Sequence, residues 1–147
     1  MDEQEEVMSG LRTVREVMSS DVTTLDVNDR LTIADDIMNL GRIRHLPVLD
    51  GDGLVAGVVS QRDLLRGALA RCIGYGQHAQ AKLFDMLLVK DVMTYDPATI
   101  GPDADLEEAA QILWDRKIGC VLVVEDERLV GLLTEGDFVR LKLAKGR

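Results

Sequence analysis

Two short stretches of the sequence hold residue types that together suit a phosphorylated sugar. GVVSQRD begins at residue 57, and GLLTEGD begins 74 positions later. In each stretch a glycine would let a ligand approach the backbone closely, a hydroxyl can bind a phosphate beside a helix N-terminus, and an aspartate can accept hydrogen bonds from both hydroxyls of a ribose. The hydroxyl and carboxyl residues are Ser60 and Asp63 in the first stretch and Thr134 and Asp137 in the second.

The same spacing has a purely structural interpretation. A Ser or Thr followed three residues later by an acidic residue commonly caps the N-terminus of a helix, because each side chain accepts a hydrogen bond from the other residue's backbone N–H. Capping alone gives no reason for the preceding glycine or for the repetition of the motif. Ligand binding and helix capping therefore both remain open for Asp63 and Asp137 at this point.

The two stretches belong to an internal repeat that covers most of the chain. At an offset of 75 residues, REVMSSDVTTL aligns with KDVMTYDPATI, LTIADDIM with LEEAAQIL, and IRHLPVLD with IGCVLVVE. The offset falls to 74 at a turn that reads DGDG in the first copy and EDE in the second. A duplication followed by a loop deletion explains this pattern.

Each copy shows the same order of secondary-structure signals. A β-prone segment follows the VM dipeptide, and a polar turn then precedes apolar residues at helical spacing. A β-branched run and a hairpin partner come next, and a second helix begins after Asp63 or Asp137. The helical positions are Leu31, Ala34, Ile37 and Met38 in the first copy and Leu106, Ala109, Ala110 and Leu113 in the second.

We expect an α+β fold of two β-α-β-β-α repeats, related by a pseudo-two-fold axis, with their sheets packed face to face. One unit of about 60 residues buries too little apolar surface to be stable alone, so pairing gives the duplication a structural reason. The predicted organisation is a first repeat over residues 14–73, a linker helix region over 74–88 and a second repeat over 89–143. Residues 74–80 interrupt the helical pattern, and 81–89 are expected to form a helix that packs on the second repeat.

Composition and charge limit the possible functions. The chain has 147 residues with 46% hydrophobic content, no apolar run long enough to span a membrane, and an acidic start unlike a secretory signal. We therefore expect a compact, soluble, cytoplasmic protein without a membrane partner. A formal net charge of −9 argues against a nucleic-acid partner, because duplex binding depends on Lys and Arg at the phosphates.

Motifs of enzymes and metal sites are not evident in the sequence. It contains no GxxxxGK phosphate loop, nucleophile elbow or HExxH motif, so no catalytic residue is expected. Cys72 and Cys120 form no CxxC pair, which predicts neither a zinc site nor a disulfide framework. His45 has no His or Cys partner at ligand spacing, so we expect it to line a pocket and assign no metal site.

The paired VM dipeptides, the strand RHLPVLD and the two motifs GVVSQRD and GLLTEGD resemble a tandem pair of cystathionine β-synthase (CBS) domains. The resemblance implies a stand-alone regulatory module that senses an adenosine-containing ligand, either AMP, ADP or ATP. In similar proteins the adenine lies between the repeats, near positions that match residues 23–25 and 98–100. Such pairs also form homodimers, and Ile33, Ile37 and Leu40 offer a second apolar helix face for this contact.

The two copies differ in the charges that surround the motif. Arg44, His45 and Arg62 of the first copy correspond to Gly119, Cys120 and Gly136, so we expect the first copy to provide the better phosphate site. The full set of expected ligand-binding residues is Thr23, Thr24, Arg44, His45, Pro47, Ser60, Arg62, Asp63, Ala98, Thr99, Gly119, Cys120, Thr134 and Asp137.

Other functions fit the same sequence. The chain could be a structural or interaction module in which the pockets are vestigial and the dimer face is the functional surface. Alternatively, the pocket could take S-adenosylmethionine, or the acidic surface could respond to Mg²⁺. The sequence names no downstream target protein.

Overall fold

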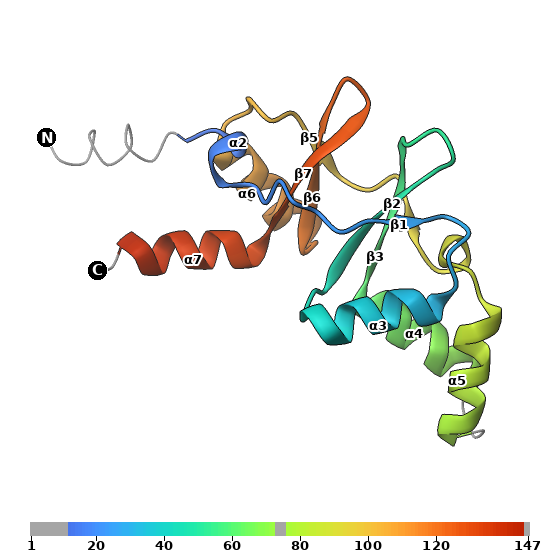
Figure 1. The fold of residues 1–147 in the computed structure, drawn as a ribbon. Coiled ribbons are helices and arrows are strands. Elements are labelled where there is room, and N and C mark those ends of the chain that lie inside the picture. Colours follow the sequence, from blue (N-terminus) through green and yellow to red (C-terminus); the bar gives the residue numbers. More distant parts are fainter. Residues whose placement is uncertain (1–11, 73–75, 146–147) are drawn as a thin grey trace, which may run out of the picture. The chain divides into compact units, whose positions relative to one another are not determined.

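The structure is a computed structural model that describes residues 12–72 and 76–145 (Figure 1). The chain divides into two compact units. One unit is Thr23–Pro97, and the other combines the described residues before Thr23 with those from Ala98 onward. The units are therefore offset from the sequence repeats, because the opening segment of each repeat belongs to the unit that contains the rest of the other repeat.

The unit Thr23–Pro97 contains a four-stranded sheet with the order β1-β2-β3-β4. The short β1 runs parallel to β2, whereas β2 pairs with β3 and β3 with β4 in antiparallel fashion. The strands are β1 (Leu25–Asp26), β2 (His45–Leu49), β3 (Val55–Ser60) and β4 (Thr94–Tyr95).

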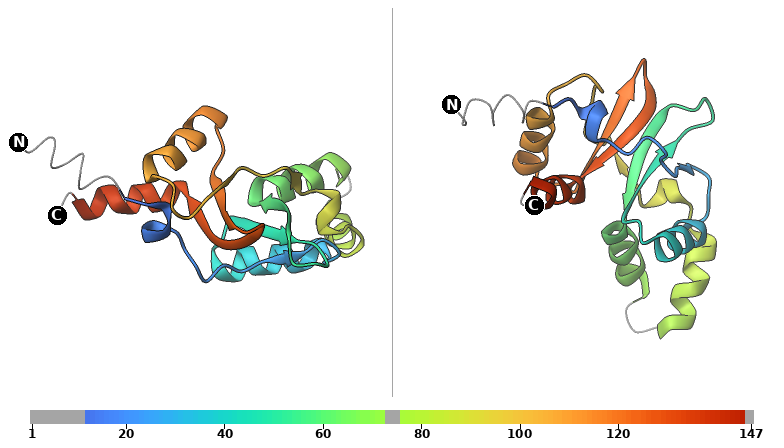
Figure 2. Two further views of the ribbon diagram at one scale, coloured as in Figure 1. Left: turned by 90° about the horizontal axis from the view of Figure 1, so that it is seen from above. Right: turned by 60° about the vertical axis from the view of Figure 1, so that its left-hand side comes forward.

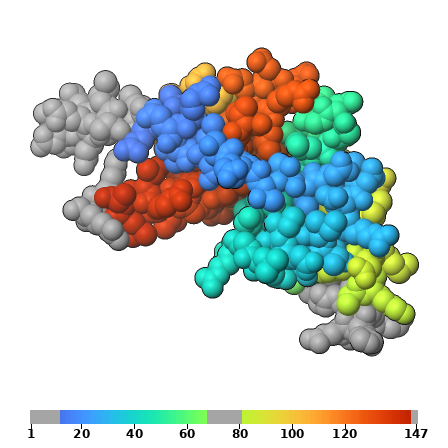
Figure 3. Space-filling view, viewed as in Figure 1, coloured from blue at the N-terminus to red at the C-terminus, as the bar shows by residue number. Residues whose placement is uncertain are grey.

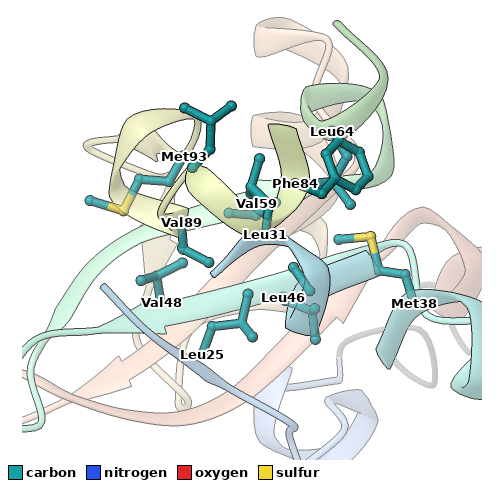
Figure 4. Close-up of a cluster of buried hydrophobic side chains, with 12 residues drawn as sticks. Leu25, Leu31, Met38, Leu46, Val48, Val59, Leu64, Phe84, Val89 and Met93 are labelled. Atoms are coloured by element: carbon teal, nitrogen blue, oxygen red, sulfur yellow. The ribbon is translucent and has the colours of Figure 1, made fainter. Parts of the chain in front are cut away.

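Helices on one side of this sheet complete the unit (Figures 1 and 2). They are α3 (Leu31–Gly41), α4 (Gln61–Cys72) and α5 (Gly76–Met86), followed by the 3-10 helix η1 (Val89–Asp91). Figure 4 shows their apolar side chains converging on those of the strands. This core consists of Leu25, Leu31, Ala34, Met38, Leu46, Val48, Val59, Leu64, Phe84, Leu87, Val89 and Met93.

Helix α5 differs from the expectation in its start and in its packing. It begins at Gly76, so residues 76–80 are helical and the glycine is tolerated at the first position. Phe84 and Leu87 join the core of the unit Thr23–Pro97, so the segment packs on α3 and α4 and the predicted packing on the second repeat is wrong. Residues 74 and 75 of the predicted linker region lie outside the described residues.

The other unit repeats this plan with a three-stranded sheet in the order β5-β6-β7. Its strands β5 and β6 are parallel, and β6 and β7 are antiparallel. The register shifts after Val48 in β2 and after Val123 in β6, which are equivalent positions of the two copies. The elements are α2 (Val14–Val17), β5 (Thr99–Ile100), α6 (Leu106–Arg116), β6 (Cys120–Glu125), β7 (Arg128–Thr134) and α7 (Glu135–Lys145).

The opening segments, residues 12–22 and 89–97, are exchanged between the copies. Ser19 exchanges two backbone hydrogen bonds of 2.9 Å with Leu132 of β7, and β4 pairs with β3. Figure 3 shows the blue opening segment lying against the orange atoms of β7. Arg15 strengthens this attachment, because its guanidinium contacts Asp103 at 3.2 Å and Glu125 at 3.1 Å, and both carboxylates raise its pKa.

The first glycine of each motif permits this exchange. A Cβ atom on Gly57 would lie 2.6 Å from the Thr94 carbonyl oxygen and 2.9 Å from the Met93 sulfur. A Cβ atom on Gly131 would collide with the Met18 sulfur in the same way. The two glycines therefore admit the opening segment of the other copy, which differs from the expected role of admitting a ligand.

The structure confirms the predicted α+β class, with two sheets that each carry their own helices. The pseudo-two-fold relation and the face-to-face packing of the sheets remain predictions.

Replacement of Gly57 by Ala should destabilise the fold, because the new methyl group meets a backbone oxygen that cannot move independently. We expect Gly57→Ala to lower the free energy of unfolding by about 1 to 3 kcal/mol, the usual cost of overpacking. Urea denaturation measures this change. Gly51→Ala is the control, because a Cβ atom there meets no atom within 4 Å, and equal stability of the two variants would contradict the role assigned to Gly57.

Candidate functional site

The expected ligand-binding residues of the first copy meet at one end of the sheet. Strands β1 and β2 begin at this end, and β3 ends there. His45 lies opposite Ser60 in the β2-β3 register, and the Arg44 carbonyl accepts a 2.9 Å hydrogen bond from the Gln61 backbone N–H. Helix α4 begins at Gln61, so Arg62 belongs to its first turn.

Asp63 and Ser60 form a reciprocal capping pair at the start of α4. The Ser60 N–H donates to Asp63 Oδ2 at 2.8 Å, and the Asp63 N–H donates to Ser60 Oγ at 3.1 Å. The capping interpretation is therefore correct as geometry. It occupies only one carboxylate oxygen, because Asp63 Oδ1 accepts no hydrogen bond or ion pair from the part of the chain that the structure describes.

The remaining first-copy residues differ in their exposure. Arg44, Arg62 and Thr23 are exposed, and His45 is partly buried. Thr24 is also partly buried and directly precedes β1, so it lies at the same sheet end as the start of β2. Pro47 is fully buried within β2, which makes it the first-copy candidate that is least available to a ligand.

The second copy assembles its candidates in the same pattern. Cys120 lies opposite Thr134 in the β6-β7 register, and the Gly119 carbonyl accepts a 3.1 Å hydrogen bond from the Glu135 N–H. The Ala98 carbonyl accepts a 2.9 Å hydrogen bond from the Leu122 N–H, and Thr99 begins β5. Thr99 is exposed, whereas Ala98 and Cys120 are buried.

Asp137 is more fully engaged than Asp63. Thr134 donates its backbone N–H to Asp137 Oδ2 at 2.8 Å and its hydroxyl to the same oxygen at 3.4 Å. The other oxygen, Oδ1, forms an ion pair with the guanidinium of Arg140. The side chain of Asp137 is 8% exposed and that of Arg140 is 70% exposed, so a solvated cation covers a buried carboxylate.

Arg140 was absent from the residues expected from the sequence. Its signal is the spacing of three positions from Asp137, which places the two side chains on neighbouring positions of one helix. The spacing alone is ambiguous, because Arg66 has the same spacing from Asp63 and the described residues show no ion pair between them.

The described residues offer neither a cluster of metal ligands nor a membrane-spanning helix. Across residues 12–72 and 76–145, no group of three or more His, Cys, Asp or Glu residues could hold a metal ion. Over the same ranges, no helix is long and apolar enough to cross a membrane.

The family model described as CBS domain matches residues 14–70 and 89–144. The chain belongs to the CBS domain family. Solved structures agree with this assignment. The structure described as that of an acetoin utilization protein, AcuB, from Vibrio cholerae is 32% identical, has a TM-score of 0.77, and the match covers 92% of this chain and 93% of that one.

Two similar structures contain adenosine compounds. CBSX2 in complex with AMP is 28% identical with a TM-score of 0.74, over 92% of this chain and 98% of that one. The CBS domain pair of protein MJ0100 in complex with 5-methylthioadenosine and S-adenosyl-L-methionine is 26% identical with a TM-score of 0.76, over the same shares.

Curated relatives include both short and long proteins. The chain is 26% identical to a CBS domain-containing protein of Dictyostelium discoideum, over 87% of this chain and 89% of that protein. It is 32% identical to a homoserine O-acetyltransferase of Methanohalophilus mahii, over 93% of this chain and only 26% of the enzyme. The chain therefore spans about a quarter of that longer relative.

The two motif aspartates should contribute unequally to stability. We expect Asp63→Ala to lower the free energy of unfolding by about 1 kcal/mol through loss of the cap, and Asp137→Ala to lower it by about 2 kcal/mol because a buried, charge-assisted bond is lost as well. Urea denaturation of both variants tests the order. Lys142→Ala, an exposed change on α7, should stay within about 0.5 kcal/mol, and a reversed order of the aspartates would contradict the assigned contacts.

Proposed function

We propose that this CBS pair is a regulatory module that binds an adenosine-containing ligand, AMP, ADP or ATP, and reports its level. The observation that carries the proposal is Asp63 Oδ1, which accepts no bond from the described residues and lies at the sheet end where Arg44 precedes β2 and Arg62 opens α4, both arginines being exposed. CBSX2 with AMP, and protein MJ0100 with two adenosine compounds, support the ligand class.

Each group has a distinct role in this proposal. Asp63 Oδ1 accepts hydrogen bonds from the ribose hydroxyls while Oδ2 continues to cap α4. The Ser60 hydroxyl and the first turn of α4 face the phosphates, which Arg62 and Arg44 neutralise. The adenine lies against the backbone near Thr24.

The proposal assigns binding rather than catalysis to this chain. Its similarity to a homoserine O-acetyltransferase covers only 26% of that protein, so the similarity does not extend to the rest of the enzyme. S-Adenosylmethionine is the second candidate ligand, because the CBS pair of protein MJ0100 contains it. S-Adenosylmethionine carries a cationic sulfonium and an amino-acid tail in place of the anionic phosphates, so loss of Arg62 should weaken the binding of a nucleotide and should not weaken the binding of S-adenosylmethionine in the same way.

A thermal-shift panel of AMP, ADP, ATP, NADH and S-adenosylmethionine, with and without Mg²⁺, tests the proposal. A ligand at about 100 times its dissociation constant stabilises the fold by about 2.7 kcal/mol, which raises the melting temperature by several degrees. Asp63→Ala should weaken the binding free energy of that ligand by about 1.5 to 3 kcal/mol. If none of these compounds raised the melting temperature, the interaction module would be favoured. Its main support is the exposed apolar side chain of Leu40 on α3, which is 87% exposed.

The positive charges of Arg44 and Arg62 predict that the first copy recognises the phosphates of the ligand. Arg62→Ala should lower the affinity for ATP or ADP by about tenfold and leave the affinity for adenosine unchanged, because the guanidinium binds only phosphate oxygens. Titration calorimetry with ATP and adenosine measures both effects. The control is Lys82→Ala, an exposed charge on α5, and equal losses for the two ligands would contradict the assignment of Arg62.

The proposal also includes a homodimer. Ile33 and Leu40 of α3 are 43% and 87% exposed, and burying them in a specific interface of at least about 1,000 Å² would remove this apolar surface from water. Light scattering should therefore give twice the 16.2 kDa chain mass. Leu40→Glu should shift the protein toward the monomer, whereas a monomeric wild-type protein at micromolar concentrations would contradict the prediction.

A further inference from the structure

The ion pair between Asp137 and Arg140 gives the second copy a property that the first lacks. Both oxygens of the Asp137 carboxylate are engaged, one by Thr134 and the other by Arg140. The equivalent Asp63 has one engaged oxygen, and Arg66 at the position of Arg140 forms no ion pair with it in the part of the chain that the structure describes.

We propose that Arg140 competes with ligand for Asp137 and thereby sets the affinity of the second-copy site for the ribose of adenosine compounds. This inference rests on the proposed function, because it concerns the same type of site. It makes Arg140 a specificity-determining residue that acts within the chain, and it makes the first copy the preferred site before any difference in phosphate contacts is considered.

The competition follows from the strengths of the hydrogen bonds involved. Both bonds are charge-assisted because the acceptor is a carboxylate, but the guanidinium adds the attraction of a full opposite charge, which a neutral ribose hydroxyl does not have. The Asp137 side chain is 8% exposed, so few other approaches to its oxygens exist. A ribose hydroxyl that approaches Oδ1 therefore competes with the guanidinium for that oxygen.

Displacement remains possible because Arg140 is a surface side chain. It is 70% exposed, so a released guanidinium is hydrated with little rearrangement of the surrounding residues. Arg140 therefore lowers the affinity of the site by a finite factor. Removal of a single charge-assisted bond should change that affinity by about tenfold.

Calorimetric titration with AMP tests the inference on the full chain. We expect Arg140→Gln to add a second binding event, or to tighten the weaker event by about tenfold, because the ribose no longer competes with a cation. Arg140→Lys keeps the positive charge and should behave closer to the wild type. Arg66→Gln is the matched control at the equivalent helix position and should change neither event. Circular dichroism checks that the variants fold.

The gained event must also depend on the second-copy aspartate. In the Arg140→Gln background, Asp137→Ala should abolish the gain, whereas Asp63→Ala should leave it in place. Unchanged or weakened AMP binding by Arg140→Gln overturns the inference, even when wild-type binding through Asp63 supports the proposed function. If the wild type binds no AMP but Arg140→Gln does, the first-copy assignment fails and the inference stands. Absence of binding by both proteins overturns both.

Discussion

The close approach of each opening segment to a glycine-containing strand is the constraint on which the rest of the structure depends. Gly57 of β3 faces the Thr94 carbonyl and the Met93 side chain with no room for a Cβ atom. Met93 then fills the core of the unit Thr23–Pro97, and Val14 of the other opening segment fills the second core. Each core therefore contains residues of both copies, so we expect the two copies to fold together rather than independently.

The same strands deliver the candidate site residues. The strand that accepts the opening segment at Gly57 ends three residues later at Ser60, where the chain turns into α4. The capping pair of Ser60 and Asp63 fixes this turn, and Asp63 Oδ1 takes no part in the cap and accepts no bond from the described residues. Ligand bound to that oxygen would also restrain the first turn of α4, so one residue can link occupancy to the stability of a helix.

Local patterns in the sequence predicted the helices and strands, whereas they did not predict the contacts between segments that are far apart in the sequence. Apolar periodicity predicted α3 and α6, and the duplication predicted the common β-α-β-β-α order within an α+β fold. The exchange could not be predicted, because a strand as short as β4 has no pattern that specifies its partner. Gly76 signalled a linker, yet packing of Phe84 and Leu87 against the core extends the helix back to that glycine. The Arg140 ion pair depends on a side-chain conformation that the spacing, shared with Arg66, does not determine.

The duplication separates structural from functional requirements within a single chain. The residue types common to both motifs, the glycine, the hydroxyl and the aspartate, each have a packing or capping task in both copies. Their presence is therefore expected even in a copy that binds nothing, and the motif by itself is weak evidence for a ligand. The informative positions are those that differ: Arg62 against Gly136 in charge, and Asp63 against Asp137 in the number of carboxylate oxygens already engaged. Both differences favour the first copy as the proposed site, because among the described residues its motif combines a carboxylate oxygen that accepts no bond with neighbouring cations, whereas the carboxylate of the second motif is already paired with Arg140.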